Sequence, residues 1–414
     1  MNNEASNPAT NIQAGRDIDL EIHGDFVGRD KITYGLSVEE VTALVIELKT
    51  AEQPTVWDGR IPYLGLSAFQ ESDAEFFFGR ENLVNDLLGR LQQSHFITIA
   101  GPSGSGKSSV ARAGLFHALR RGRLPKSDQW LLATMLPGNH PLESLAVAIE
   151  RLTKVAGSAD SLRHKGLENP HALHQQVEIL LTDDPSQRLV LLVDQFEEVF
   201  TQTKNEAEQA AFIQLLTHSA HSTQTGGNRL TILLSLRSDF ISHCARYPAL
   251  RELLNQQFML VGGMEAHDLA KAITLPALEV GAEIDPALVS RIMADMKGEP
   301  GVLPLMSFAL RDLFEAEKTA VGKPMDLTLP EYVQRGGIEK ALERHANAVF
   351  ADFSAEQQAL ARGVFSKLIE VGQGRVDTRR TAVFSELIPA GQDATAVSQV
   401  VDTLARAGGA ADDE

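Results

Sequence analysis

A short glycine-rich segment constrains this chain more than any other feature. Residues 101–108 read Gly-Pro-Ser-Gly-Ser-Gly-Lys-Ser, which matches the phosphate-binding pattern G-x-x-x-x-G-K-[ST]. In such a loop the backbone N–H groups surround phosphate oxygens, and the following helix adds its positive N-terminal end. The flanks fit this geometry, because residues 95–100 are an apolar run typical of a strand and residues 109–121 have a helical pattern. The sequence therefore predicts an α/β core with a site for a phosphate chain.

Two side chains of this loop have predicted roles of their own. We expect Lys107 to reach the β- and γ-phosphates of a nucleotide and the Ser108 hydroxyl to ligate Mg²⁺. The alternative is an ordinary surface loop, which would need neither the strand before it nor the helix after it. The full set of nucleotide contacts expected from the loop is Gly101, Ser103, Gly104, Ser105, Gly106, Lys107, Ser108 and Ser109.

A second apolar run carries acidic residues at its end. Residues 189–193 predict a strand buried on both faces, and Asp194 follows directly. An acid at this end of a parallel strand is placed to hold Mg²⁺, usually through water. Many ATPases place the acid that activates the attacking water directly after this aspartate, but here that residue is Gln195. If hydrolysis is fast, Glu197 or Glu198 must therefore supply that acid. The alternative is that both glutamates form a solvated helix start, where acids are favoured.

A third apolar run ends near an arginine. Residues 230–234 predict another strand, and Arg237 follows it closely. An arginine at such a strand end is placed to contact the γ-phosphate and to sense its presence. The alternative is a structural ion pair with Asp239 or another acid.

These motifs, with two more, resemble the STAND class of signalling NTPases, and most of all its novel-STAND branch of mainly multidomain bacterial proteins. Residues 62–66 (PYLGL) and 76–81 (FFFGRE) look like the first motif of that branch. Residues 301–305 (GVLPL) resemble the Gly-x-Pro motif of its helical lid. The likeness covers roughly residues 60–408, and the combination and order of the motifs make it specific.

The resemblance also implies roles for residues outside the loop. Gly79 and Arg80 would lie near the nucleotide base, and Pro304 would pack on the adenine. One residue more separates Gly301 from Pro304 than in the family motif, so we assign the proline and not the glycine.

The acidic segment and the third strand fit the same family. Residues 194–198 look like its metal motif, in which Glu197 and Glu198 match an acidic pair, and Arg237 matches its sensor arginine. The resemblance implies ATP or ADP with Mg²⁺ as ligands. It implies a switch in which ADP holds the lid closed, while ATP favours an open state that forms homo-oligomers. Hydrolysis would be slow, and the setting would be bacterial signalling, in defence or cell-death control.

The expected fold class is α/β: a parallel-sheet P-loop NTPase core of the AAA+ or STAND kind, a helical lid, a partial winged-helix domain and a small N-terminal β-repeat. Residues 1–36 would be the β-repeat, with a flexible tail as the alternative. The other expected units are a helix and linker at 37–60, the core at 61–261, the lid at 262–348 and the winged-helix-like domain at 349–414. Relatives usually carry a C-terminal repeat array as sensor, so we expect a fragment or a form without one. The trigger and the effector are not identified by the sequence.

Several helix starts can be located from capping patterns. Ser37 is expected to cap a helix that runs to about residue 52, and Asp285 to cap one with proline at its first position. Another helix should open at Ser354 and run to Glu370, and the last should span residues 395–407. Wing strands would be expected only beyond the end of this chain.

Composition narrows the function classes. Of the 414 residues, 38 are basic and 55 acidic, giving a net charge of −17 that disfavours a broad nucleic-acid or anionic-membrane surface. The single cysteine, Cys244, allows no internal disulfide and suits a reducing cytoplasm. We find no apolar run of the ~18 residues that a membrane span needs, and no signal peptide.

Two other functions stay open. The first is a DNA-binding ATPase that uses the winged helix, but residues 346–414 carry six basic and ten acidic residues, a poor electrostatic match to DNA. The second is a scaffold that binds nucleotide without hydrolysing it, which a turnover assay would distinguish from the switch.

Overall fold

The computed structural model describes nine segments of the chain. The predicted β-repeat lies outside them except for Leu36. The described segments are 36–50, 53–153, 158–181, 186–221, 228–296, 301–370, 378–379, 382–389 and 392–407.

A parallel sheet of five strands, in the order β2-β3-β4-β1-β5, forms the centre of the core. Its strands are β1 (Phe96–Gly101), β2 (Leu131–Met135), β3 (Leu189–Val193), β4 (Leu230–Arg237) and β5 (Phe258–Leu260). All neighbouring pairs are parallel, and β4 lies between β1 and β3. The three strands with predicted motifs are therefore adjacent, and their carboxyl ends meet at one edge, as ligand sites in such sheets require. The predicted α/β parallel-sheet core is confirmed.

The sheet is covered on both faces, which explains why β3 is apolar throughout. Leu191 and Val193 belong to one hydrophobic cluster, whereas Val190 and Leu192 belong to the cluster on the opposite face. This follows from the two-residue period of a strand. The helices of this core are α2 (Glu81–Leu91), α3 (Lys107–Ser109), α4 (His117–Arg120), α5 (Pro141–Thr153), α6 (Ser158–Lys165), α7 (Ala172–Leu180), α8 (Glu198–Thr201), α9 (Glu206–His221), α10 (Ile241–Cys244) and α11 (Pro248–Gln256).

The helix after the glycine-rich loop is confirmed, with a local change of pitch. It begins as α3, continues as a π-helical stretch at Val110–Phe116 and ends as α4. Wider turns of this kind occur often at functional sites, because they shift the side chains that follow. Here the wider turn includes Arg112, which forms an ion pair with Asp194.

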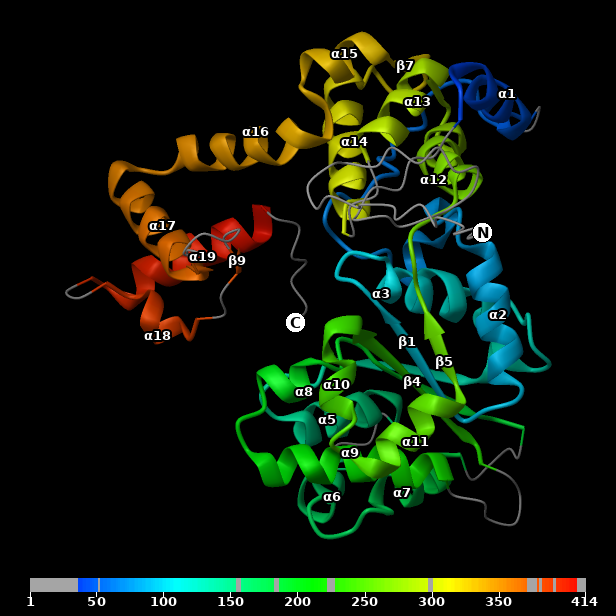
Figure 1. Cartoon of the computed structure of the whole chain (residues 1–414), viewed down its shortest axis with the longest axis vertical. Helices are drawn as coiled ribbons and strands as arrows, with labels where there is room; N and C mark the ends of the chain where they lie inside the picture. The colour runs from blue at the N-terminus through cyan, green and yellow to red at the C-terminus, as the bar shows by residue number, and fades with distance from the viewer. Residues whose placement is uncertain are drawn as a thin grey trace, which may run out of the picture.

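A mainly helical unit follows the core and lies above its sheet (Figure 1). It contains α12 (Ala266–Glu279), α13 (Pro286–Asp295), α14 (Leu303–Glu317), α15 (Leu329–Gln334) and α16 (Gly337–Asp352), with β6 (Ala282–Ile284) paired in parallel to β7 (Met325–Leu327). The predicted cap at Asp285 is present, since its side chain accepts a hydrogen bond from the Ala287 N–H at 2.9 Å. We call this unit the lid.

The first described helix belongs spatially to the lid rather than to the core. Helix α1 (Val38–Leu48) packs on α12 and α13, and buries Val41 and Val45 in the hydrophobic cluster of the lid. The capping box predicted at Ser37 is present. The helix ends at Leu48, before the expected end near residue 52, because Lys49 is already extended.

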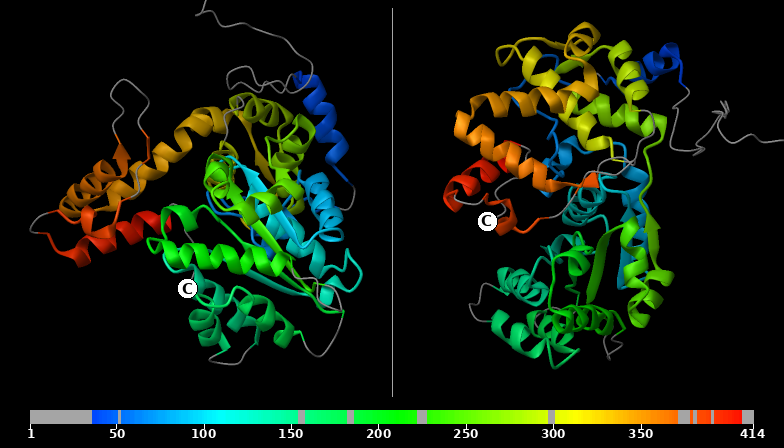
Figure 2. Two further views of the ribbon diagram at one scale, coloured as in Figure 1. Left: turned by 60° about the horizontal axis from the view of Figure 1, so that its bottom comes forward. Right: turned by 60° about the vertical axis from the view of Figure 1, so that its left-hand side comes forward.

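The last part of the chain forms a smaller unit at the end of the long helix α16 (Figures 1 and 2). It comprises α17 (Ala355–Leu368), α18 (Phe384–Leu387), α19 (Ala394–Ala407) and the antiparallel pair β8 (Ile369–Glu370) and β9 (Thr378–Arg379). The capping box at Ser354 is present. The helix stops at Leu368 and not at Glu370, because residues 369 and 370 join the strand pair. The winged-helix assignment of this unit stays a prediction.

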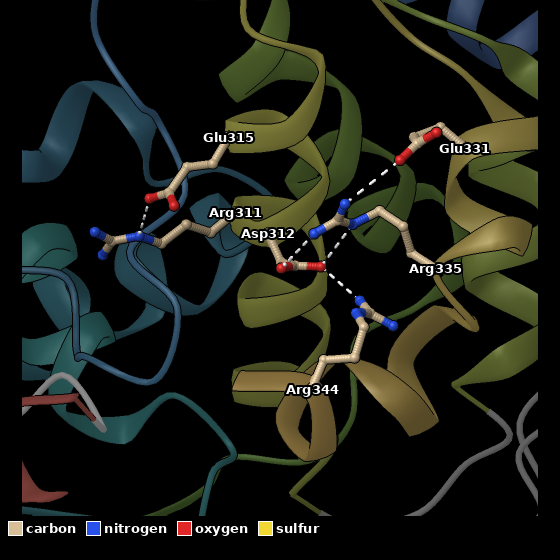
Figure 3. Close-up of polar contacts among 6 residues, drawn as sticks. All are labelled: Arg311, Asp312, Glu315, Glu331, Arg335 and Arg344. Atoms are coloured by element: carbon tan, nitrogen blue, oxygen red, sulfur yellow. Dashed lines mark hydrogen bonds and ion pairs between the residues drawn. The ribbon is translucent and has the colours of Figure 1, made fainter. Parts of the chain in front are cut away.

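One charged cluster ties α14 to the end of α15 and to the middle of α16 (Figure 3). Arg335 donates to both carboxylate oxygens of Asp312, at 2.9 and 2.8 Å, and Arg344 donates to Oδ2 at 2.5 Å. Burial by itself raises the pKa of Asp312, but the hydrogen bonds and charges of the two arginines outweigh it and hold that pKa below its usual value. We call these three residues the Asp312 clasp.

Replacing the clasp carboxylate should weaken the lid. We expect Asp312→Asn to lower the free energy of unfolding by about 1–2 kcal/mol, less than a fully buried pair would cost because solvent screens this one. Since the folded-state pKa of Asp312 is lowered, its contribution is present above the ordinary pKa of aspartate and is lost as the pH falls through the lowered value. Denaturation of both proteins at neutral and acid pH measures this.

The matched control lies one turn further along α14. Glu315 accepts from Arg311 at 3.1 Å in an exposed pair, so Glu315→Gln should change stability by about 0.5 kcal/mol or less (Figure 3). Equal effects of the two substitutions would show that the clasp is no more than a surface ion pair.

Candidate functional site

The glycine-rich loop has the backbone shape that its sequence predicts. Gly104 and Gly106 have φ values of 74° and 87°, in the left-handed region that other residues rarely adopt. Because of these turns, α3 starts directly at Lys107.

Lys107 is buried at the base of the loop. Its Nζ donates to the carbonyl oxygens of Gly101, at 3.1 Å, and Pro102, at 2.8 Å. Burial lowers the pKa of Lys107, and the nearby carboxylates of Glu197 and Asp194 only partly oppose this. The amine is therefore held by weak neutral partners, and a phosphate group would be a better one.

Ser108 and Asp194 meet across the gap between the loop helix and β3. The Ser108 hydroxyl donates to Asp194 Oδ1 at 2.9 Å, and the Asp194 side chain is fully buried. Two adjacent oxygen donors of this kind are the ligands that Mg²⁺ prefers, so the residues present fit the predicted metal. Arg112, which the sequence analysis did not single out, also contacts Asp194, donating from Nη2 to Oδ2 at 2.9 Å. The sequence clue to this contact is that Arg112 lies four residues after Ser108, on the same continuous helix.

The three serines of the loop besides Ser108 differ in surroundings. Ser103 is exposed, whereas Ser105 and Ser109 are buried. The Ser109 hydroxyl accepts from the N–H of Phe69 at 3.1 Å, which ties the loop helix to the segment before α2. The Ser105 hydroxyl has no hydrogen-bond partner among the described residues.

The two candidate glutamates point to different partners. Glu197 is 8% exposed, and its carboxylate accepts from the N–H of Arg237 at 3.1 Å. Glu198 accepts from the N–H of Gly138, beyond the end of β2, at 3.0 Å. Burial raises the pKa of both carboxyl groups. Of the two, Glu197 is the one whose pKa the charge of Lys107 lowers.

Arg237 forms the ion pair that was its alternative assignment. It donates to the two oxygens of Asp239 at 3.2 and 2.6 Å, and its guanidinium lies over the Phe240 ring, 5.5 Å from the ring centroid. Its charge nevertheless lowers the pKa of both Lys107 and Glu197. The side chain is thus near the loop but engaged elsewhere.

A cavity of about 230 Å³ lies between the loop and the lid. Its core side includes Gly104, Gly106, Lys107, Ser108 and Ser109, and its lid side includes Met264, Ala272, Leu303, Pro304, Met306 and Ser307. A third side is apolar and comes from the segment before α2, with Tyr63, Leu66, Phe69, Phe76, Phe77 and Phe78. The predicted adenine residue Pro304 therefore lines the same cavity as the loop lysine.

The Gly-Arg pair before α2 holds the lid to the core. Arg80 lines the cavity and donates from Nη2 to the carbonyl oxygens of Ser105, at 3.1 Å, and Gly262, at 3.0 Å. Gly79 does not line it. Instead a Cβ at Gly79 would lie 2.2 Å from the carbonyl oxygen of Asp268 in α12, so only glycine permits this approach.

Gly301, the glycine that we did not assign from the sequence, touches the loop directly. It has a φ of 93°, and a Cβ there would lie 2.9 Å from the carbonyl oxygen of Ser103. In turn, a Cβ at Gly104 would lie 2.9 Å from the Gly301 Cα. The backbones of the lid and the loop are therefore in contact at two glycines.

Comparison with models of known protein families gives a match over most of the chain. The family model described as Novel STAND NTPase 1 matches residues 62–408. Among curated proteins, none matches. None of the helices in the described segments combines the length and the apolarity needed to cross a bilayer.

Solved structures give more distant likenesses. The ORC2 protein of Aeropyrum pernix in its ADPNP–ADP complexes is 16% identical, with a TM-score of 0.46 over 80% of this chain and 94% of that one. The Aeropyrum pernix ORC1 protein in complex with DNA is 13% identical, with a TM-score of 0.44 over 80% and 84%. The RuvB Holliday junction branch migration motor of Thermotoga maritima is 16% identical, with a TM-score of 0.38 over 82% and 90%.

Adding a methyl group at Gly301 should force the lid away from the loop. We expect Gly301→Ala to weaken ADP binding by about tenfold or more, which is about 1.4 kcal/mol. Gly322→Ala is the matched control, because Gly322 has a similar φ of 80° but nothing within 4 Å of an added Cβ. Both variants lose about 1–2 kcal/mol of stability from backbone strain, but only Gly301→Ala should lose affinity by calorimetry. Similar affinities would contradict the contact.

Proposed function

We propose that this chain, which belongs to the novel STAND NTPase 1 family, is an ATP-binding and slowly hydrolysing switch that changes its domain arrangement and forms homo-oligomers with ATP. The observation that carries the proposal is the cavity of about 230 Å³ that is walled by the loop on one side and by the lid on the other. A nucleotide bound there contacts both units, so its phosphates bias their arrangement.

The phosphate end of the nucleotide would bind at the loop. Lys107 then exchanges the carbonyl oxygens of its own loop for phosphate oxygens, which are stronger partners because they are charged. Ser108 and Asp194 supply the oxygen ligands for Mg²⁺. The metal supplies charge neutralisation of the phosphates when bound.

The base would lie in the apolar half of the cavity, between the phenylalanines before α2 and Pro304 at the start of α14. This surface suits the flat face of adenine. Arg80 donates to the carbonyl oxygen of Ser105 in the loop and to those of Gly262 and Gly263, which lead from β5 to the lid. We therefore propose that Arg80 orders this wall of the cavity rather than contacting the base with its full charge.

Hydrolysis would depend on Glu197 more than on Glu198. Glu197 is buried and close enough to Lys107 for their charges to affect each other, whereas Glu198 is held by Gly138 beyond β2. Glu197 also accepts a hydrogen bond from the backbone N–H of Arg237. A γ-phosphate that attracts the Arg237 side chain away from Asp239 would therefore act on a residue in direct contact with the general base.

Helix α14 offers a path from the nucleotide to the rest of the chain. Its first turn, with Pro304, lines the cavity, and further along it Asp312 holds Arg335 and Arg344. A shift of α14 would therefore move the end of α15 and the middle of α16, and α16 leads to the last unit (Figures 1 and 3). Family likeness supports a role in bacterial signalling, in defence or cell-death control, and a cytoplasmic location.

Particle mass tests the switch directly. With ADP we expect the mass of one chain, and with a non-hydrolysable ATP analogue a several-fold larger assembly, measured by mass photometry or light scattering. Lys107→Ala should abolish tight nucleotide binding and the mass increase together, because the loop then has no cation for the phosphates. A folded Lys107→Ala protein that still binds ATP or still assembles would refute the proposal. Unchanged mass of the wild-type protein, despite binding, would contradict the oligomerising switch, and a turnover assay would then test for the non-hydrolysing scaffold.

Glu197→Gln should separate stability from turnover. We expect single-turnover hydrolysis to slow by roughly 10²–10⁴-fold, the usual range for a lost general base. Because burial raises the pKa of Glu197, its ionised form costs stability once the pH has risen through that value. The variant should therefore be at least as stable as the wild type at neutral pH. If only Glu198→Gln slows turnover, the assignment within the pair is wrong; if neither does, the catalytic role fails.

A further inference from the structure

Arg112 is a charged residue beside Asp194 that the proposed reaction does not use. It lies within the π-helical stretch, four residues after Ser108, and its side chain is 15% exposed. Its guanidinium forms an ion pair with Asp194, whose side chain is 1% exposed. This is the most buried ion pair among those that the structure records for the described residues.

The two oxygens of Asp194 are divided between different partners. Oδ1 accepts from the Ser108 hydroxyl at 2.9 Å and from the N–H of Gln195 at 3.0 Å. Oδ2 accepts from Arg112 at 2.9 Å. Arg112 therefore fixes the rotation of the carboxylate, so that only the oxygen beside Ser108 faces the loop.

Arg112 is also free to respond, because its other contacts are few. Nη1 donates to Gln70 Oε1 at 3.0 Å, and the buried Nε has no partner in the described part of the chain. A cavity of about 550 Å³ adjoins Arg112 and Gln70 on the side of β2. The ion pair with Asp194 is thus the main interaction that holds this guanidinium in place.

Charge decides what this arrangement does to a metal. A divalent cation beside Ser108 and Asp194 would meet a carboxylate already neutralised by Arg112, with the cationic Lys107 on the same loop. Like charges at such short range repel strongly in a site with little water. The phosphates of a nucleotide would remove this penalty.

We propose that Arg112 is a positioning residue that makes divalent-metal binding conditional on nucleotide: it neutralises Asp194 in the nucleotide-free site and orients Oδ1 toward Ser108. The proposal rests on the proposed function for the assignment of Asp194 as a metal residue.

Mn²⁺ binding, followed by electron paramagnetic resonance, tests this without measuring turnover. In the nucleotide-free wild type we expect weak binding, and with saturating ADP binding that is at least about a hundredfold tighter. Arg112→Met should tighten nucleotide-free Mn²⁺ binding by about tenfold or more, because it removes the charge that competes for Asp194. Arg112→Gln serves the same purpose if the methionine variant does not fold. Arg112→Lys, which keeps the charge, should resemble the wild type.

The matched control is Arg120→Met. Arg120 also joins the loop helix to the preceding segment, through an exposed ion pair with Glu71 at 3.3 Å, but it does not touch Asp194. Its Mn²⁺ affinity should equal that of the wild type. Adding Asp194→Asn to Arg112→Met should abolish the gain.

Several results would overturn the proposal. These are unchanged Mn²⁺ affinity in a folded Arg112→Met or Arg112→Gln protein, a gain that survives Asp194→Asn, or wild-type protein that binds Mn²⁺ as tightly without ADP as with it. ADP binding in the presence of a chelator is measured in parallel. If ADP does not bind at all, the proposed function fails instead, and the two failures are distinguished.

Discussion

Charged groups held away from water at the carboxyl edge of the sheet are the constraint on which the site depends. Lys107, Asp194, Glu197 and Arg112 are all largely buried there, and each would be costly to bury alone. They are stabilised by one another and by backbone groups from β1, β4 and the loop helix. Such contacts are replaceable, because a phosphate and a metal can satisfy the same groups. A nucleotide with its metal could therefore bind here at little cost in unpaired charge.

The second constraint is the close contact between lid and core. At Gly79 and Gly301 the backbone of one unit lies against the backbone of the other, with no room for a side chain. Contacts of this kind are sensitive to small shifts, since backbone atoms cannot rotate out of the way as side chains do. A bound nucleotide would act on this contact between lid and core, because the cavity lies between the two units. The Asp312 clasp then joins the responding helix to α16 (Figure 3).

Much of the architecture could be predicted from local patterns. The strands around the loop, the caps at Ser37, Asp285 and Ser354, and the α/β class follow from short-range rules of periodicity and capping, and all are present. Ends of elements were predicted less well. The helix from Ser354 stops at Leu368 because the next residues pair with β9, a partner several residues further along that no helical pattern reveals.

The groups that the site needs can be identified from local sequence: a loop with glycines at its left-handed turns, a lysine and serine at its helix start, and acids and an arginine at the ends of apolar strands. These requirements are local, because backbone conformation and spacing fix them. Which of these groups meet in space depends instead on the packing of distant segments. The pairing of Arg112 with Asp194 and the contact of Gly301 with the loop depend on the order of strands and the packing of the lid. These are distances between segments far apart in the chain, and no spacing along the sequence contains them.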